Sequence, residues 1–302
     1  MTTLDDEYRR LIEEAGLPPE ALPSDAFFSS AAEREVDRAK AEAAPAAEVS
    51  ELEAAVPESV AAWDGRWASL GGIPAGHLDG NTLEQGAAAL RAAGGDPGPL
   101  PIGVLISGSG TNLQAIIDRI ADGTLNAEIK LVVASRPSAA GLKRAEDAGI
   151  QTLTLSKDIY ADPIMADEVI AGELYRAGVA YVVMAGYMRK VHAPLLATFP
   201  GRVINLHPAL LPSFPGAHGI ADAYERGVKV TGVTVHIANA AYDQGPIIAQ
   251  EPVRIEEGWT LEQLEERIHE VEHELYPRVV QMLADGRVTV RPDLTVEVAP
   301  EA

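Results

Sequence analysis

An alternation of short apolar runs with helix-forming segments, beginning at residue 102, limits the fold of this chain more than any other feature. The apolar runs have the length of buried strands, and helices are expected from near Asn112 and over 140–148 and 162–177. Strands that alternate with helices of about ten to fifteen residues build a mainly parallel sheet with helices on its faces. We therefore predict an α/β, Rossmann-like fold, with strands at 102–106, 129–134, 152–155, 181–185 and 202–206.

The pattern changes after residue 230. Two apolar runs, 231–238 and 247–255, follow each other without a helix, and the short connection between them suits an antiparallel return. A long helix is predicted over 260–285, and residues 288–290 are predicted to form an edge strand.

Residues 1–99 differ in composition from the rest and are predicted to form an extension to a domain over 100–302. They contain 19 Asp and Glu against 7 Lys and Arg. Trp63 and Trp67 supply apolar anchors, and residues 94–101 have the glycine and proline content of a linker. Two interpretations stay open: a helical acidic extension that docks on the main domain or on a partner, and a partly disordered arm. Helices are expected at 3–15, 30–43, 50–63 and 81–94.

Composition excludes several classes of protein. The 302 residues include no cysteine, which rules out disulfides, thiolate metal sites and a cysteine nucleophile. The net charge of −21 argues against nucleic-acid binding, which depends on clustered Lys and Arg. Residues 1–7 lack the basic start and apolar run of a signal peptide, and the most apolar stretch, 179–188, is too short to span a bilayer. We therefore expect a cytoplasmic protein without nucleic-acid or membrane partners.

Three polar side chains are predicted to meet near the end of one strand. Asn205 and His207 lie where strand 202–206 ends, because Pro208 has no N–H to donate to a ladder, and Asp243 lies in a loop of turn-forming residues. Open α/β sheets bind ligands at the carboxyl ends of their strands. An amide, an imidazole and a carboxylate can stabilise an oxyanion, donate a proton and hold the charge of the imidazole. Spacing alone leaves open an ordinary strand-end histidine and a turn-forming aspartate.

A glycine loop at 108–112 joins the first predicted strand to its helix. Glycines let the backbone approach a phosphate, and the helix start offers unpaired N–H groups. A dinucleotide fingerprint requires glycine where Leu113 stands and an acidic residue after the second strand, where the chain has Arg136. The loop therefore favours a single phosphate over a dinucleotide, with a tight turn that binds no ligand as the alternative.

Together these motifs resemble the glycinamide ribonucleotide formyltransferases of purine biosynthesis. That family carries an Asn-x-His-Pro-(Ser/Ala)-Leu-Leu-Pro motif, present here at 205–212, and a Leu/Tyr-Asp-x-Gly-Pro motif, present at 242–246. The resemblance covers residues 101–290 and implies a formyltransferase-type sheet. Further matches, in the order and spacing of the family, lie at 106–115, 184–189 and 272–277.

The resemblance implies an enzyme that transfers the formyl group of 10-formyltetrahydrofolate, its co-substrate, to 5-phosphoribosylglycinamide without a metal. Asn205 and protonated His207 match the residues that stabilise the oxyanion, and Asp243 matches the one that holds the imidazolium. The positions that match the ribonucleotide site are Gly110, Thr111, Asn112 and Glu272. The positions that match the folate site are Met188, Arg189, Lys190, Val191, Asn205, Asn239 and Tyr242.

One position departs from the family pattern. The family often carries a folate-contacting arginine in the loop after the third strand, where this chain has Pro163, so the contact to the folate tail is in question. His236 matches a buried residue expected to act indirectly. His269 and His273 lie one helical turn apart but have no evident third ligand, and no metal site is expected.

Alternatives within and outside the family lead to other functions. Formyltetrahydrofolate deformylase delivers the formyl group to water, but it usually carries an N-terminal ACT domain and a histidine where Pro208 stands. Methionyl-tRNA formyltransferase needs a basic C-terminal domain, whereas residues 297–302 are acidic. A non-enzymatic interaction protein is expected to have lost at least one member of the amide, imidazole and carboxylate set. A homodimer and a protein partner for residues 1–99 are both left open.

Overall fold

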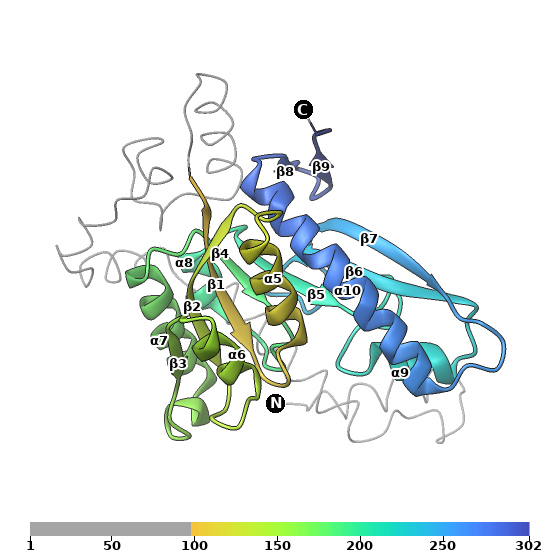
Figure 1. Cartoon of the computed structure of the whole chain (residues 1–302), viewed down its shortest axis with the longest axis horizontal. Coiled ribbons are helices and arrows are strands. Elements are labelled where there is room, and N and C mark those ends of the chain that lie inside the picture. The colour runs from red at the N-terminus through yellow and green to blue at the C-terminus, as the bar shows by residue number, and fades with distance from the viewer. Residues whose placement is uncertain (1–97, 302) are drawn as a thin grey trace, which may run out of the picture. The chain divides into compact units, whose positions relative to one another are not determined.

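A seven-stranded sheet forms the centre of the structure, a computed structural model that describes residues 98–301 (Figure 1). Its strand order is β3-β2-β1-β4-β5-β6-β7. β1 to β5 pair in parallel, and β6 and β7 join antiparallel, which confirms the predicted mainly parallel sheet and its antiparallel return. The strands are β1 (Leu100–Ile106), β2 (Ala127–Ala134), β3 (Thr152–Thr154), β4 (Tyr181–Met184), β5 (Val203–His207), β6 (Val230–Ile237) and β7 (Ile247–Arg254).

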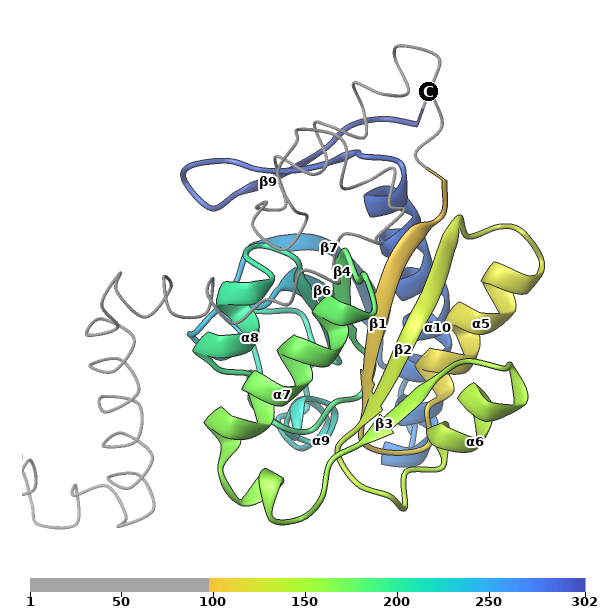
Figure 2. The ribbon, with the colours of Figure 1, turned by 90° about the vertical axis from the view of Figure 1, so that its left-hand side faces the viewer.

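Helices cover both faces of this sheet (Figure 2). One hydrophobic core joins α5, α6 and α10 to the sheet, and a second core joins α7 and α8 to the opposite face. The helices expected at 1–97 lie outside the described residues. The helices of the described part are α5 (Thr111–Ala121), α6 (Gly141–Asp147), α7 (Pro163–Arg176), α8 (Ala193–Thr198), α9 (Gly219–Glu225) and α10 (Leu261–Ala284).

The long helix α10 is fixed at its start and near its middle. Thr260 accepts from the backbone N–H of Gln263, whose side chain accepts from the Thr260 N–H, so the first turn is closed by a capping box. Further along, the buried hydroxyl of Tyr276 lies 3.0 Å from the carbonyl of Met184 and 3.1 Å from that of Ile204. This contact holds α10 against β4 and β5.

The sheet reverses its order between β1 and β4. From β1 the chain moves outward through β2 and β3 and then returns to form β4 on the other side of β1. In open α/β sheets the loops that leave two such strands diverge and open a crevice at their carboxyl ends. The glycine loop after β1 and the loop after β4 therefore border a natural ligand site.

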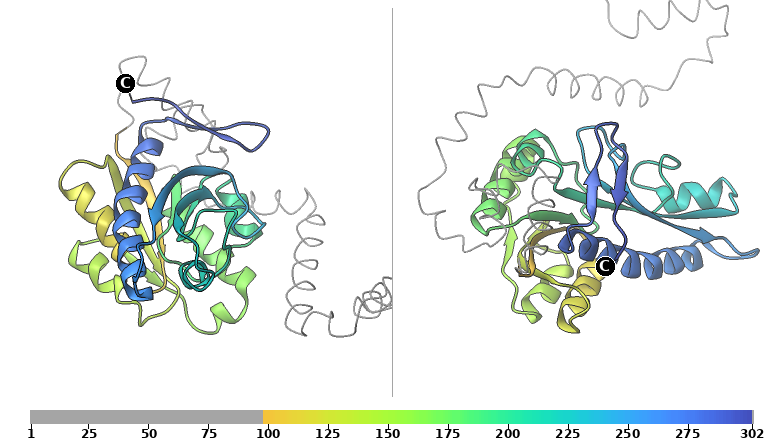
Figure 3. Two further views of the ribbon diagram at one scale, coloured as in Figure 1. Left: turned by 90° about the vertical axis from the view of Figure 1, so that its right-hand side faces the viewer. Right: turned by 90° about the horizontal axis from the view of Figure 1, so that it is seen from above.

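Several details differ from the sequence expectation. The strand predicted at 288–290 is present as β8 (Val288–Val290), but it pairs with β9 (Val296–Val298) in a separate two-stranded sheet and not with the main sheet (Figure 3). β5 continues one residue beyond 206, because His207 still pairs with Thr234. The short helices α8 and α9 were not predicted. Within residues 98–301, none of the helices has the length and hydropathy of a membrane span.

Candidate active site

The carboxyl ends of β1, β4 and β5 surround a cavity of about 280 Å³, called here the main cavity. A smaller cavity of about 30 Å³ shares Asn205, Tyr242 and Asp243 with it. The main cavity thus joins the glycine loop, the loop after β4, the end of β5 and one turn of α10. Its longer polar side chains are Asn112, Arg136, Tyr187, Asn205, His207, Tyr242, Asp243, His269 and Glu272.

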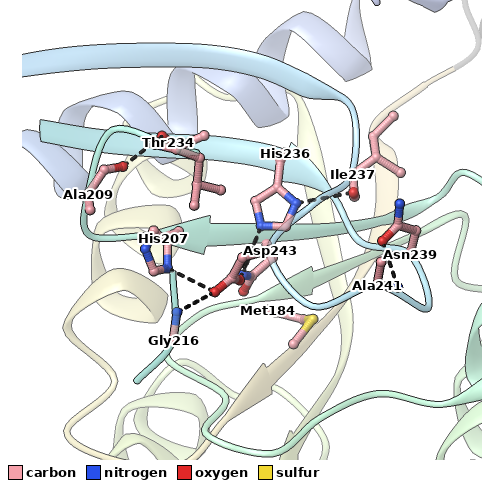
Figure 4. Close-up of polar contacts among 12 residues, drawn as sticks. Met184, His207, Ala209, Gly216, Thr234, His236, Ile237, Asn239, Ala241 and Asp243 are labelled. Atoms are coloured by element: carbon pink, nitrogen blue, oxygen red, sulfur yellow. Dashed lines mark hydrogen bonds and ion pairs between the residues drawn. The ribbon is translucent and has the colours of Figure 1, made fainter. Parts of the chain in front are cut away.

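Asp243 reaches the main cavity from the β6–β7 loop (Figure 4). Its backbone is left-handed, with φ of 54°, an uncommon conformation that aspartate tolerates better than most residues. The N–H of Gly216 donates to its Oδ2 at 2.8 Å. Its side chain is 2% exposed, so this carboxylate is held in a fixed position with little water around it.

His207, the last residue of β5, faces that carboxylate (Figure 4). Its Nε2 lies 2.8 Å from the carbonyl of Phe214, which can only accept, so Nε2 carries the hydrogen. Its Nδ1 lies 3.6 Å from Asp243 Oδ2, which is longer than a hydrogen bond. The Nδ1 edge of the ring therefore faces the carboxylate without a hydrogen bond, and Nδ1 is left available to a ligand.

Asn205 is oriented by the buried His236. His236 Nδ1 lies 3.1 Å from the Ile237 carbonyl and therefore donates to it. Burial lowers the pKa of His236, which favours the neutral ring, and its Nε2 then accepts from Asn205 Nδ2 at 3.2 Å. One amide N–H of Asn205 is used in this contact, and the second stays available to a ligand. His236 thus positions the side-chain amide of Asn205 and does not itself act as an acid or base in the site.

The glycine loop begins α5 without a side-chain cap. Gly110 is the N-cap residue, with φ of 70°, and no side chain bonds the first turn. A Cβ on Gly110 would lie 2.6 Å from the Cα of Gly141, so glycine is required here by packing against α6 as well as by φ. At Gly108 an added Cβ meets no atom within 4 Å. The N–H groups at the start of α5 thus have no side-chain cap and can accept an anion at the wall of the main cavity.

Glu272 lies opposite this loop on α10. Asn112 Nδ2 donates to its Oε2 at 2.9 Å. The residue is 6% exposed, and burial raises the pKa of its carboxyl. The pair joins α5 to α10 and brings a carboxylate to the wall of the cavity.

The loop after β4 is attached to the end of β1. The N–H of Met188 donates to Ser107 Oγ at 2.8 Å. The guanidinium of Arg189 lies 4.1 Å from the centre of the Tyr160 ring, and burial raises the pKa of Tyr160, so the stacked ring is an uncharged phenol. Pro163 is the first residue of α7.

The structure brings the sequence-predicted residues to two adjoining cavities. The main cavity is lined by Asn205, His207 and Asp243, by Gly110, Thr111, Asn112 and Glu272, and by Met188 and Tyr242. The small cavity is lined by Arg189, Lys190, Val191, Asn205, Asn239 and Tyr242. In the described part of the chain, no group of three or more His, Asp or Glu side chains could hold a metal ion.

Four residues near the site were missed by the sequence reasoning. Ser107 links two loops through its hydroxyl, Arg136 lines the main cavity, and Phe214 and Gly216 contact His207 and Asp243 through their backbones. Backbone contacts between distant segments leave no pattern in the sequence. The Pro215-Gly216 turn and the position of Arg136 directly after a strand were the available signals.

Comparison with known proteins identifies the family. The formyl transferase family model matches residues 101–280. Phosphoribosylglycinamide formyltransferase of Bacillus subtilis is 39% identical over 180 residues, which are 60% of this chain and 92% of that protein. The human trifunctional purine biosynthetic protein adenosine-3 is 39% identical over 187 residues, which are 62% of this chain but 18% of that larger protein.

Solved structures agree with this comparison. Glycinamide ribonucleotide transformylase 1 of Symbiobacterium toebii superposes with a TM-score of 0.65 at 43% identity and covers 67% of this chain and 95% of its own. Phosphoribosylglycinamide formyltransferase of Coxiella burnetii gives a TM-score of 0.63 at 38% identity, with 66% and 93% covered. The chain therefore belongs to the formyl transferase family and, within it, to the phosphoribosylglycinamide formyltransferases.

Proposed function

We propose that this chain transfers the formyl group of 10-formyltetrahydrofolate to the amine of 5-phosphoribosylglycinamide, giving formylglycinamide ribonucleotide and tetrahydrofolate in de novo purine biosynthesis. The observation that carries the proposal is the main cavity. It combines an anion-binding helix start with the amide, imidazole and carboxylate of Asn205, His207 and Asp243. The ribonucleotide amine and the formyl carbon can thus be held in one cavity.

In the chemical step the neutral amine attacks the formyl carbon, and the carbonyl oxygen becomes an oxyanion. The free N–H of Asn205 and the Nδ1–H of His207 donate to this oxygen, as preorganised donors do for tetrahedral intermediates. Asp243 faces the imidazole and assists transfer of the proton that the attacking nitrogen loses to the departing folate nitrogen, with water as the carrier. Collapse of the intermediate then breaks the bond between the formyl carbon and that nitrogen.

The ribonucleotide is bound by the glycine loop and by α10. The backbone of Gly110, Thr111 and Asn112 at the start of α5 holds the phosphate, because helix N-termini attract anions. Glu272 binds the sugar or the glycinamide portion. This assignment is supported by the 2.9 Å contact between Asn112 and Glu272, which joins the two ends of the subsite.

The folate is bound at the small cavity and the adjoining part of the main cavity. Residues 188–191 and the pair Asn239 and Tyr242 form its two walls. The stack of Arg189 on Tyr160 supports a contact between Arg189 and the carboxylate tail of the folate, in a chain that has Pro163 in place of the usual arginine. Metal plays no part in this scheme because the formyl group is already activated.

The direct test is an assay with full-length protein, 10-formyltetrahydrofolate and glycinamide ribonucleotide. We expect tetrahydrofolate and formylated ribonucleotide to appear in equal amounts, and neither to form at a comparable rate without the ribonucleotide. Tetrahydrofolate released equally fast without the amine acceptor would show a hydrolase and would refute the proposal.

Residues 1–99 are proposed to lie outside the catalytic unit. The family model begins to match at residue 101, and the residues that line both cavities follow it. A chain that starts at Pro99 is expected to fold and to keep transfer activity within about tenfold of full length, a change of about 1.4 kcal/mol in the barrier. Complete loss of activity in a folded truncated chain would place part of the active site in the extension.

A further inference from the structure

The glycine loop alone does not supply enough positive charge to balance a phosphate bound in the main cavity. A ribonucleotide phosphate brings up to two negative charges into a cavity that is already lined by the carboxyl groups of Asp243 and Glu272, with the imidazoles of His207 and His269 as its other titratable groups besides tyrosine and arginine. The start of a helix contributes only about half a positive charge. Among the described residues that line this cavity, the single Lys or Arg is Arg136.

Arg136 is anchored directly beside the glycine loop. It follows β2 by two residues, and its Nε donates to the carbonyl of Ser107 at 2.7 Å. Ser107 immediately precedes Gly108, and its hydroxyl lies 2.7 Å from that of Ser135. These contacts fix the base of the guanidinium. Within the part of the chain that the structure describes, its two terminal nitrogens make no hydrogen bond or ion pair.

A second arginine near the loop has a different arrangement. Arg144 on α6 donates from Nε to the carbonyl of Ser109 at 2.9 Å and from Nη1 to Gln114 Oε1 at 3.1 Å. It does not line the main cavity. Arg144 therefore uses its guanidinium to stabilise the loop. Arg136 is anchored only through Nε, and its two terminal nitrogens lie in the cavity wall and can donate to a ligand.

We propose that Arg136 binds the 5′-phosphate of the ribonucleotide together with the backbone of the glycine loop, and that it makes the enzyme selective for phosphorylated over unphosphorylated glycinamide riboside. The proposal rests on the proposed function. A guanidinium presents paired N–H groups that match two phosphate oxygens, and such charge-assisted hydrogen bonds are stronger than neutral ones. The residue thus supplies the full positive charge that the helix start lacks.

The test compares Arg136→Met with Lys143→Met in full-length protein. Lys143 is exposed on α6 and pairs with Asp147, so its replacement removes the same charge without touching the cavity. Each variant is assayed with glycinamide ribonucleotide and with the glycinamide riboside that lacks the phosphate. For Arg136→Met we expect KM for the ribonucleotide to rise roughly ten- to hundredfold, the range for hydrogen bonds to a charged group, with kcat little changed.

The riboside supplies the decisive comparison. Its kcat/KM is expected to be the same in Arg136→Met and wild type, because the interaction partner is absent, and Lys143→Met should match wild type with both substrates. Equal losses on both substrates in Arg136→Met would mean that the residue only supports Ser107 and its loop. An unchanged ribonucleotide KM would mean that the backbone holds the phosphate alone. Either result overturns the proposal.

Calorimetry separates this proposal from the proposed function. If wild-type protein shows no formyl transfer, the proposed function fails, but the affinity for glycinamide ribonucleotide is still measurable. Affinity that is present in wild type and lost in Arg136→Met supports the role of Arg136 as a phosphate-binding residue. Equal affinity in the two proteins contradicts it.

Discussion

The two sides of the main cavity are built in different ways. On the β1 side, the proposed anion-binding position is local: one loop of consecutive residues, 107–112, presents backbone N–H groups at the start of α5. On the β5 side, the reactive groups are side chains from distant segments. Asn205 and His207 come from a parallel strand, and Asp243 comes from the antiparallel hairpin that follows.

In the proposed function, this difference separates substrate binding from the chemical step. On the β1 side, the proposed phosphate contacts come from the loop backbone, whose shape requires Gly110, and from the side chain of Arg136. The β5 side depends on the positions of an amide, an imidazole and a carboxylate, which are fixed by buried contacts to His236, Phe214 and Gly216. Changes on the β1 side are therefore expected to weaken substrate binding, and changes on the β5 side to slow the chemical step.

Asp243→Asn is expected to give the largest effect. The substitution keeps the shape of the side chain and removes the charge that faces His207 at 3.6 Å. We expect kcat to fall by on the order of 10²-fold or more, as for other preorganised electrostatic contributions, with KM for both substrates changed only a few-fold. Steady-state kinetics measures the split. Asp158→Asn, at an exposed position that lines neither cavity, is the matched control. A kcat near that of wild type would remove Asp243 from the mechanism.

Gly108→Val tests the β1 side without disturbing the fold. The Cβ meets no protein atom within 4 Å, so the added side chain occupies space next to the loop instead of displacing it. Loss of one hydrogen bond to a phosphate costs about 1.5–3 kcal/mol, so KM for the ribonucleotide should rise roughly tenfold or more. The melting temperature should stay near that of wild type. An unchanged KM would identify the loop as a turn without a ligand.

Gly110→Val provides the contrast to that variant. Its Cβ would meet the Cα of Gly141 at 2.6 Å, and the backbone has a positive φ. Strain of this kind costs about 1–3 kcal/mol, so this variant should lose stability before it reports on phosphate binding.

Glu272→Gln is expected to weaken ribonucleotide binding about tenfold, because it removes one charged hydrogen-bond partner of the ligand. The same substitution is expected to raise the stability of the folded protein. Burial raises the pKa of the Glu272 carboxyl above its ordinary value of 4.5. The folded state then binds more protons than the unfolded state, so the carboxyl costs stability as pH rises through and above 4.5. Gln removes this cost and still accepts from Asn112. At pH 7 the melting temperature should therefore be higher than that of wild type.

The pH dependence supplies the check on this prediction. Well below pH 4.5 the carboxyl is protonated in both states, and the stability gain of Glu272→Gln should vanish. Thermal denaturation of both proteins at several pH values measures it. A gain that is the same at every pH would show that packing, and not ionisation, is responsible.

Arg189→Met is expected to have the smallest effect, and only on the folate. The guanidinium is stacked on Tyr160 at an exposed position, where salt and water weaken its attraction for a carboxylate. We expect KM for the folate to rise about threefold to tenfold and KM for the ribonucleotide to stay constant, in line with the ~1 kcal/mol of an exposed ion pair. Arg176→Met, on α7, removes the same charge from a residue that lines neither cavity. An equal change in both variants would rule out a specific contact.

The sequence predicted the sheet better than its periphery for a physical reason. Buried strands such as β1 and β4 are continuous apolar runs, and their identity does not depend on distant contacts. α8 and α9 contain six and seven residues and are stabilised by packing instead of by their own helical periodicity. The sequence could not predict that β8 pairs with β9, because the pairing of a strand depends on which segment lies beside that strand in the folded chain.

The same reason limits what the sequence says about the site. The motif around Asn205 and His207 could be read directly, because its residues are neighbours on one strand. The bond from His207 to the Phe214 carbonyl and that from Gly216 to Asp243 involve backbone groups, which any residue type could supply. The sequence therefore indicates the candidate reactive groups, whereas the contacts that orient these groups are found only in the folded structure.

The division of labour between the two sides is tested most directly by a double-mutant cycle on kcat/KM for the ribonucleotide. It compares wild type, Gly108→Val, Asp243→Asn and the double variant. If one side binds and the other reacts, the two losses in transition-state free energy add within about 0.5 kcal/mol, as they do for independent sites. A coupling energy well above about 1 kcal/mol, or a kcat loss in Gly108→Val as large as that in Asp243→Asn, would contradict the division.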